Sequence, residues 1–217
     1  WHPDLKPATA LLDPSVTIGL PRDLTAWTGS DAMVHAIEAY CVPDFHPLCD
    51  GIALEALRLT STWLRTAVTS PENIEARGAM LVGSCLAGVS FLKGLGLVHA
   101  ISHMIGATYD THHGLTNAIL LPAVLRFNEP AIKAKVPQMA EAMALHDKSF
   151  AGFHDAICTL LDDLSIPKTL TDIGVPSNCA AAMAKKALQD AAASTNPRPS
   201  SEADIQAIIE DAIRAGR

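Results

Sequence analysis

Two pairs of polar residues, each four positions apart in an otherwise apolar or small segment, constrain the fold of this chain more than any other feature. Asp31 and His35 form the first pair, and His99 and His103 form the second. Residues four apart lie on one face of an α-helix, so each pair converges only if its segment is helical. Because an unpaired buried polar group costs about 1–3 kcal/mol, both pairs need a partner in the interior. The pattern predicts two helices whose polar groups share a common partner in the interior.

The residue types in these pairs suit a transition-metal ion. His112 and His113 follow the second pair directly before Gly114, where we expect a helix end and a turn. Neutral imidazoles with one carboxylate favour Fe²⁺ or Zn²⁺ over Ca²⁺ and Mg²⁺, which prefer oxygen ligands. The alternative is structural, because a chain with nine histidines has some pairs at this spacing by chance, and histidines on apolar helices are often hydrogen-bonded core residues. Spacing alone leaves both interpretations open.

Helix signals cover most of the chain. Hydrophobic residues make up 49% of the sequence and aromatic residues only 5%, which favours closely packed helices. No segment of any length alternates apolar and polar residues as a half-buried strand does. We therefore predict an all-α helical bundle. Its expected helices lie near residues 21–41, 47–68, 98–109, 114–127, 131–144, 149–164, 177–193 and 201–215, with another that follows Ser70 and Pro71.

Four local features carry separate expectations. The apolar run 79–92 is too short for a membrane span and is expected to be a buried helix. Pro122 is expected to bend or end its helix, because proline lacks the N–H that the helix needs. Residues 11–17 are expected to be extended, and the Asn-Pro-Arg-Pro segment 196–199 is interpreted as a plain turn.

Charge and cysteine content exclude several classes of protein. A net charge of −7 provides no basic surface for nucleic acid or anionic lipid, so neither nucleic acid nor a membrane is expected as a partner. The five cysteines are scattered and odd in number, which argues against a disulfide framework or a zinc knuckle. Residues 1–7 lack the apolar core of a signal peptide. A reducing cytoplasm is the expected compartment.

Two long segments resemble a known enzyme family. Residues 24–40 read LTAWTGSDAMVHAIEAY, and residues 93–103 read KGLGLVHAISH, followed by HGLTNAILLP at 113–122. Both blocks, in this order, resemble the metal-binding blocks of the iron-containing, or group III, alcohol dehydrogenases. The sequence departs from the family pattern at Met104 and His112, where many members have proline.

The resemblance implies a role for each polar residue of the two blocks. It makes Asp31, His35, His99 and His113 the metal ligands, for Fe²⁺ or alternatively Zn²⁺. His113 is preferred to His112 because it immediately precedes Gly114 and lies fourteen residues after His99, as in the family. The resemblance also makes His103 a candidate catalytic residue that relays a proton or orients the substrate. Glu38 is expected to support the ligands or to lie on the surface.

The resemblance covers only the second half of such an enzyme. Residues 1–20 are expected to connect a missing N-terminal nucleotide-binding domain to an all-helical metal-binding domain at 21–217, similar to the C-terminal domain of the dehydroquinate synthase-like fold. The sequence has no Gly-rich loop after an apolar strand that would bind a dinucleotide, so no cofactor-binding residue is assigned. The implied enzyme interconverts small alcohols with aldehydes or ketones by hydride transfer to or from NAD or NADP, with a homodimer as a candidate assembly.

This implies that the 217-residue chain is inactive by itself. Two alternatives remain at this stage. One is a relative similar to the zinc-dependent glycerol dehydrogenases, and the other is a helical metal-binding module without catalytic activity.

Overall fold

The computed structural model describes residues 7–217, and this part of the chain is helical and contains no strand. The predicted all-α class is therefore confirmed. In chain order the elements are η2 (Pro14–Thr17), α1 (Arg22–Cys41), α2 (Pro47–Thr69), α3 (Ile74–Ser90), η3 (Phe91–Lys93), α4 (Leu97–Tyr109), α5 (His113–Ile132), α6 (Val136–Ala142), α7 (Phe150–Asp163), η4 (Thr171–Ile173), α8 (Ala180–Ala187), η5 (Ala191–Thr195) and α9 (Glu202–Arg214).

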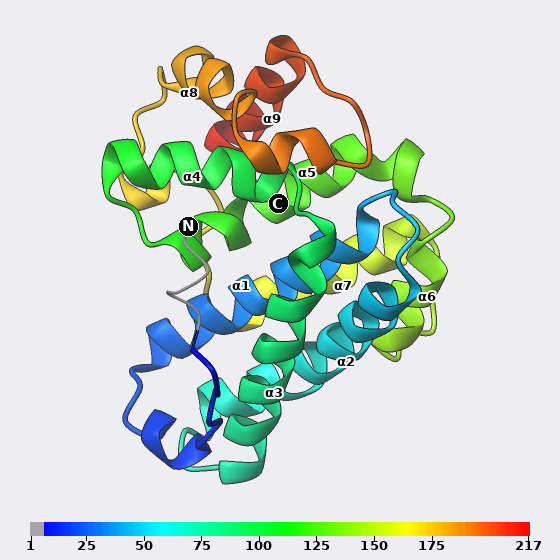
Figure 1. The fold of residues 1–217 in the computed structure, drawn as a ribbon. Helices are drawn as coiled ribbons and strands as arrows, with labels where there is room; N and C mark the ends of the chain where they lie inside the picture. The colour runs from blue at the N-terminus through cyan, green and yellow to red at the C-terminus, as the bar shows by residue number, and fades with distance from the viewer. Residues whose placement is uncertain (1–6) are drawn as a thin grey trace.

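Helix α1 is the central element of the bundle. It contacts α2 and α3 on one side and α5 on another, while α4 and α9 pack on α5, and α8 packs on α4 and α9. Figure 1 shows α4, α8 and α9 at one end of the molecule and α2 and α3 at the other, with α1 between them. Because α1 is apolar or small on nearly every side, most of its residues from Thr25 to Cys41 are buried. Its few polar side chains consequently lie in the interior.

The predicted helices are present, and some of their ends differ from the prediction. Pro122 was expected to bend or end its helix; α5 passes through Pro122 and continues to Ile132, so Pro122 does not end it, and a bend stays a prediction. Residues 114–125 of this helix are buried, and tertiary packing there overrides the local cost of the proline. The helix expected at 131–144 is limited to Val136–Ala142. The helix expected at 177–193 is divided into α8 and η5 by Asp190, which caps the second piece.

The segment at 11–17 is only partly extended. Residues 14–17 form the 3-10 helix η2, because the Asp13 carboxylate accepts a hydrogen bond from Ser15 N and starts the turn. The connector that we predict for residues 1–20 begins with residues 1–6, which lie outside the described part of the chain. The proposed boundary at residue 21 coincides with the start of α1 and stays a prediction.

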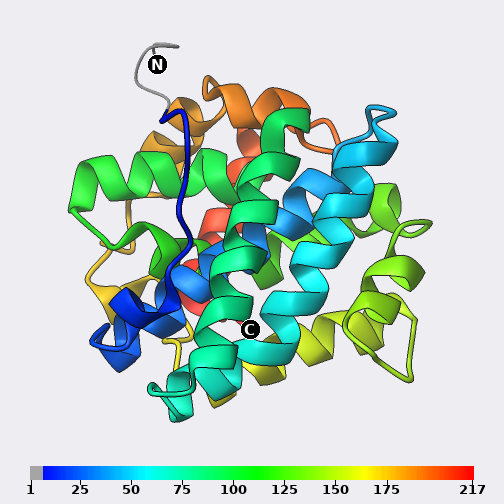
Figure 2. The ribbon, with the colours of Figure 1, turned by 60° about the horizontal axis from the view of Figure 1, so that its bottom comes forward.

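Helix α3 is more exposed than the sequence indicates. It packs on α1 and α2 (Figure 2), but its residues Val82 and Val89 project from the surface, as does Leu92 of the following η3. In length and hydropathy the segment Ile74–Lys93 could cross a membrane, and only 28% of its most apolar window is buried in the structure. The expectation of a buried helix is therefore wrong, because one face of α3 packs on the bundle and the other has no neighbour in the described structure.

Candidate metal centre

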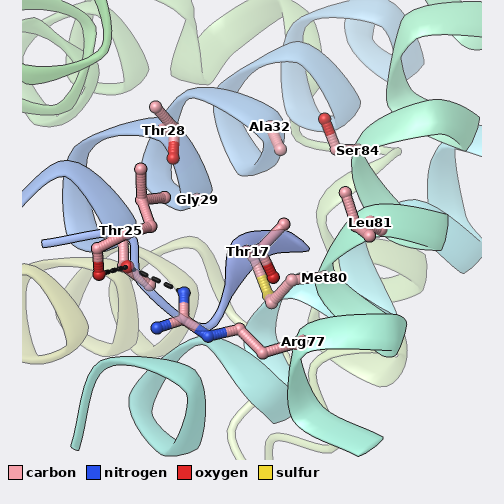
Figure 3. Close-up of a pocket in the computed structure, with 10 residues that line it drawn as sticks. Thr17, Thr25, Thr28, Gly29, Ala32, Arg77, Met80, Leu81 and Ser84 are labelled. Carbon is pink, nitrogen blue, oxygen red and sulfur yellow. Dashed lines mark hydrogen bonds between the residues drawn. The ribbon is translucent and has the colours of Figure 1, made fainter. Parts of the chain in front are cut away.

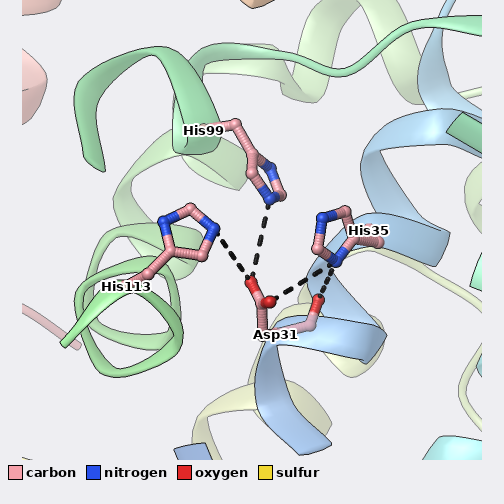
Figure 4. Close-up of side chains that lie close together, drawn as sticks. All are labelled: Asp31, His35, His99 and His113. Carbon is pink, nitrogen blue, oxygen red and sulfur yellow. Dashed lines mark hydrogen bonds and ion pairs between the residues drawn. The ribbon is translucent and has the colours of Figure 1, made fainter. Parts of the chain in front are cut away.

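The polar face of α1 provides the first half of the site. Asp31 and His35 lie one helical turn apart and point in the same direction, as Figure 4 shows. His35 Nδ1 lies 2.9 Å from the backbone oxygen of Asp31 and 3.7 Å from its Oδ2. Because a carbonyl oxygen only accepts hydrogen bonds, Nδ1 carries the proton and donates. The lone pair of the ring is therefore on Nε2.

The start of α4 provides His99, which is fixed by Glu38 of α1. The His99 side chain is 1% exposed, and its Nδ1 lies 2.7 Å from Glu38 Oε2. An ionised carboxylate only accepts, so Nδ1 carries the proton and the Nε2 lone pair points toward Asp31, at 3.7 Å from its Oδ1. The same Glu38 carboxylate accepts the backbone N–H groups of Gly96 and Val98, which begin the helix. A Cβ at Gly96 would lie 2.7 Å from Glu38 Oε1, so only glycine allows this approach.

The start of α5 provides His113, and a close contact between helices brings it near α1. A Cβ at Gly114 would lie 2.4 Å from the backbone oxygen of Trp27, so the glycine lets α5 pack directly on α1. His113 Nε2 then lies 3.5 Å from Asp31 Oδ1, and its side chain is 42% exposed. The neighbouring His112 has another role, because its Nδ1 accepts the N–H of Leu115 and caps α5.

The structure thus brings together the four side chains that the sequence analysis predicts as ligands. Asp31, His35, His99 and His113, which we call the quartet, each offer one ligand atom, and these atoms all lie within 4.8 Å of one another. Among the described residues, the ion-pair partners of Asp31 are all histidines of the quartet. The site is therefore rich in lone pairs and contains no lysine or arginine partner for them.

Burial keeps two histidines of the site, His35 and His113, neutral. The pKa of His35 is lowered to about 4, first by burial and then by neighbouring His99, with Asp31 and Glu38 opposing the shift. The pKa of His113 is also lowered, chiefly by burial and partly against the effect of Asp31. Both rings therefore carry a free lone pair at neutral pH. A neutral imidazole is the form that binds a metal ion.

Sequence reasoning missed Asn117, which lies at the centre of the quartet. Its Nδ2 is 2.6 Å from Asp31 Oδ1, 3.1 Å from His99 Nε2 and 3.0 Å from His113 Nε2. One amide group has two hydrogens for these three acceptors, and its own buried Oδ1 has no hydrogen-bond partner. The sequence does contain a signal for Asn117, because this residue follows His113 by four positions and so lies on the same helix face.

This donor set fits a divalent transition-metal ion. The Nε2 atoms of His99 and His113, the His35 imidazole and one carboxylate converge, and the Asn117 amide among them cannot satisfy all of these acceptors. Buried acceptors without a balancing positive charge are unfavourable, and a cation would pair with all four at once. Nitrogen ligands favour Fe²⁺ or Zn²⁺ over ions that prefer oxygen.

His103 lies beside the quartet and belongs to a second polar pair. Its ring stacks on His113, with centroids 5.5 Å apart and planes inclined by 14°, and its Nδ1 lies 3.0 Å from Asp190 Oδ2. A cavity of about 500 Å³ is open along His103 and Asp190 and extends to Phe91, which contacts the His35 ring. The sequence analysis did not select Asp190, because it is 87 residues from His103 and carries no spacing signal.

A second cavity, of about 120 Å³, lies away from the quartet (Figure 3). Thr25, Gly29 and Ala32 of α1 line it together with residues of α3, and none of the quartet does. Arg77 reaches into this region and donates from Nη1 to Thr25 Oγ1 at 2.8 Å. Burial lowers the pKa of Arg77. This cavity is close to α1 but does not open onto the donor atoms described above.

The geometry thus defines an all-helical domain organised around three histidines and one aspartate. Comparison with known proteins assigns this domain to a family. A family model described as "Fe-containing alcohol dehydrogenase family, C-terminal" matches residues 25–213, and the chain belongs to this family. The resemblance found in the sequence is confirmed, including its restriction to the C-terminal part.

Several relatives are enzymes of about twice the length. The chain is 41% identical over 218 residues to the 1,3-propanediol dehydrogenase of Klebsiella pneumoniae, covering 95% of this chain and 55% of that protein. It is 35% identical over 219 residues to the NAD-dependent methanol dehydrogenase of Bacillus methanolicus, covering 96% and 57%. The chain therefore spans about half the length of the curated relatives it matches.

Solved structures agree with this assignment. The crystal structure of a 1,3-propanediol oxidoreductase superposes with a TM-score of 0.90 at 41% identity, covering 93% of this chain and 55% of that one. The iron-containing alcohol dehydrogenase from Thermococcus thioreducens gives a TM-score of 0.90 at 28% identity, with 99% and 57% covered. The helical bundle described above is thus the fold of the corresponding half of these enzymes.

Proposed function

We propose that this chain is the metal-binding catalytic half of an NAD(P)-dependent alcohol dehydrogenase. The observation that supports the proposal best is the quartet, whose four ligand atoms lie within 4.8 Å of one another in a partly buried site. Family membership supports the reaction class, since the relatives include dehydrogenases of 1,3-propanediol and methanol. The proposed substrate is a small alcohol or the corresponding aldehyde or ketone.

The proposed metal ligands are the quartet, with Fe²⁺ as the expected ion and Zn²⁺ as the alternative. An ion of this kind, when bound, supplies Lewis-acid polarisation of a hydroxyl or carbonyl oxygen. Glu38 holds the His99 ring by its Nδ1, so Nε2 keeps its orientation. The lowered pKa of His35 keeps its ring neutral near pH 7 and available as a ligand.

His103 is the proposed proton acceptor. It borders the cavity of about 500 Å³ next to the quartet, which is lined by apolar side chains such as Phe91 and Leu95. In alcohol oxidation the hydride leaves with its electron pair for a nicotinamide, and the hydroxyl proton passes to a base near the cavity. The name of the Bacillus methanolicus relative supports NAD as the hydride acceptor.

A second domain is proposed to provide the nucleotide site. The relatives are about twice as long as this chain, and hydride transfer requires the nicotinamide to be held close to the reacting carbon. The five cysteines of the chain are all free, which agrees with the reducing cytoplasm that we propose as its compartment.

The assignment of the quartet is tested by metal analysis of the purified chain together with thermal melting. We expect about one Fe²⁺ or Zn²⁺ per chain, and a melting temperature that falls when a chelator removes it, because a bound ligand stabilises the folded state. His99→Ala and Asp31→Asn are expected to lose the metal. His112→Asn is the matched control, since asparagine is a good N-cap and His112 serves as one. Unchanged metal content in both ligand variants would contradict the proposal.

A further inference from the structure

Asp190 is held in place by contacts that do not involve the quartet. It is the N-cap of η5, and its Oδ1 accepts the N–H of Ala192 at 2.8 Å. Its Oδ2 is the oxygen that faces His103 Nδ1, at 3.0 Å. The side chain is only 16% exposed. The two carboxylate oxygens therefore have separate partners, one in the backbone and one in the imidazole.

The segment that carries Asp190 is fixed to the segment that leads into α4. Thr195 Oγ1 donates to Leu95 O at 2.7 Å and accepts from Leu95 N at 3.2 Å. The next residue, Asn196, accepts the N–H of Leu97 through its Oδ1 at 3.1 Å. Since α4 carries His103, these contacts set the distance between the carboxylate and the ring. The pair is thus built into the fold.

The hydrogen bond to Asp190 determines which nitrogen of His103 is protonated. An ionised carboxylate only accepts, so Nδ1 must donate, and the neutral ring has its lone pair on Nε2. The ring, whose side chain is 41% exposed, stacks on His113 and meets His99 edge-on at a centroid distance of 5.8 Å. Among the lining residues of the adjacent cavity, Asp190 is the only acidic one.

From this geometry we propose that Asp190 is a positioning residue that keeps His103 in the Nδ1–H tautomer, with Nε2 as the proton acceptor. The proposal rests on the function proposed above and adds a residue to it. In alcohol oxidation the substrate O–H bond breaks and its proton bonds to Nε2, while the C–H electron pair leaves as hydride to the nicotinamide of NAD(P)⁺. Asp190 continues to accept the Nδ1–H hydrogen bond from the imidazolium that forms.

Replacement by asparagine should reverse the tautomer. In Asp190→Asn the amide oxygen can still accept the N–H of Ala192, and the amide nitrogen then faces His103 as a donor. Nδ1 must accept this hydrogen bond, so the proton moves to Nε2. In a Ser-His-Asp triad the same change leaves the geometry intact but lowers kcat about 10⁴-fold because the histidine takes the wrong tautomer.

The experiment is NMR of the 217-residue chain labelled with ¹⁵N-histidine. Long-range ¹H–¹⁵N correlations at about pH 9, well above the usual histidine pKa of about 6.5, report which ring nitrogen is protonated. The His103 signals are assigned by their loss in His103→Gln. We expect the Nδ1–H pattern in the wild type and the Nε2–H pattern in Asp190→Asn. A wild-type Nε2–H pattern, or the same pattern in both proteins, would overturn the proposal.

Two further variants keep the test decisive. Asp13→Asn is the matched control, because Asp13 also caps a 3-10 helix through its side chain but contacts no histidine. It should leave the His103 signals unchanged. Asp190→Ser keeps a residue that caps well but removes the carboxylate, and His103 should lose its preference for Nδ1–H. If Asp190→Asn does not fold, Asp190→Ser provides the test, and an unchanged His103 tautomer in Asp190→Ser would likewise overturn the proposal.

The same samples separate this proposal from the metal assignment. The tautomer is measured in the presence of a chelator, and metal content is measured after the chelator is removed and Fe²⁺ or Zn²⁺ is added back. A wild type that takes up no metal but has the expected tautomer would contradict the function proposed above and leave the role of Asp190 standing. Metal bound in both proteins with an unchanged tautomer would contradict the role of Asp190 alone.

Discussion

At the scale of single residues, Glu38 connects the metal-ligand helix α1 to the start of α4. Its carboxylate is 5% exposed and accepts hydrogen bonds from the backbone N–H groups of Gly96, Val98 and His99 and from the His99 ring. A negative charge at a helix N-terminus is favourable, because the first N–H groups have no partner within the helix. One side chain therefore stabilises α4 and orients a proposed ligand.

We predict that Glu38→Gln weakens metal binding by about 10–100-fold, the usual effect of removing a group that orients a ligand. The amide must place its NH₂ group against at least one of the N–H donors that the carboxylate accepts, so the melting temperature should fall as well. The measurement is titration of Zn²⁺ into the chelator-treated chain. Glu55→Gln is the control, since Glu55 lies on the surface and pairs with Arg58. Wild-type affinity in Glu38→Gln would show that this carboxylate does not affect the metal site.

The sequence predicted the members of the quartet but not the residues that support them. Asp31, His35 and His99 were found because their spacing places them on helix faces within apolar segments. Asp190 and Asn196 act over long sequence separations, and no local pattern indicates where the fold will place them. For Glu38 the sequence left two roles open, support of the ligands or a position on the surface. Its burial and its contact with His99 exclude the surface position.

At the scale of elements, apolar spacing and helix start signals predicted most helices. Helix α9, for example, begins with a capping box between Ser201 and Asp204, and its observed bounds are within one residue of the prediction. The predictions of helix burial and helix ends were wrong where tertiary packing determines the outcome. The apolar run of α3 was expected to be buried, but hydropathy does not reveal which faces of a helix find a neighbour. The same limit explains why Pro122 did not end α5.

The turn at 196–199 does more than connect α8 and η5 to α9, so its interpretation as a plain turn was wrong. Asn196 is 7% exposed. Its Oδ1 accepts from Leu97 N at 3.1 Å and from Asn128 Nδ2 at 3.0 Å, and its Nδ2 donates to Asn128 Oδ1 at 2.8 Å and to Arg198 O at 2.7 Å. This side chain therefore joins α4, α5 and the C-terminal segment.

We predict that Asn196→Ala lowers the free energy of unfolding by about 2–4 kcal/mol, because it leaves Leu97 N and the buried amide of Asn128 without partners. Urea denaturation followed by circular dichroism measures the change. Asn73→Ala is a matched control, since Asn73 only caps the start of α3, and it should cost about 1 kcal/mol. Equal losses in the two variants would mean that the contacts of Asn196 contribute no more than an ordinary helix cap.

At the scale of the whole molecule, the helical domain brings the polar side chains of the candidate metal centre together between its helices. In the described part of the chain, no lysine or arginine side chain pairs with them there. The quartet, Asn117 and Glu38 occupy the region where α1, α4 and α5 meet, and His35 and His113 remain neutral because burial opposes their protonation. His154 behaves similarly at a distance from the quartet. Its pKa is lowered, first by burial and then by the neighbouring Arg126 guanidinium, which lies 3.1 Å from Nε2.

These shifts predict that the metal-free chain becomes less stable as the pH falls below about 6.5. His35, with its pKa lowered to about 4, stays neutral in the folded chain, while in the unfolded chain the same residue binds a proton near its ordinary pKa of 6.5. The unfolded state then binds more protons, so stability decreases as pH decreases, by about 1.4 kcal/mol per pH unit for each such histidine. His113 and His154 shift in the same direction and add to the effect.

Urea denaturation in the presence of a chelator, between about pH 7.5 and pH 5, measures this dependence while carboxylates of ordinary pKa stay ionised. His154→Gln is the informative variant, because glutamine can still accept from Arg126 but does not titrate. It should reduce the dependence of the free energy of unfolding on pH without changing the quartet, and His35→Gln should reduce this dependence further. A free energy of unfolding that is constant over this range would contradict the view that burial keeps these histidines neutral. The metal-loaded chain should show the steeper dependence, because protons then compete with the ion for the same ring nitrogens.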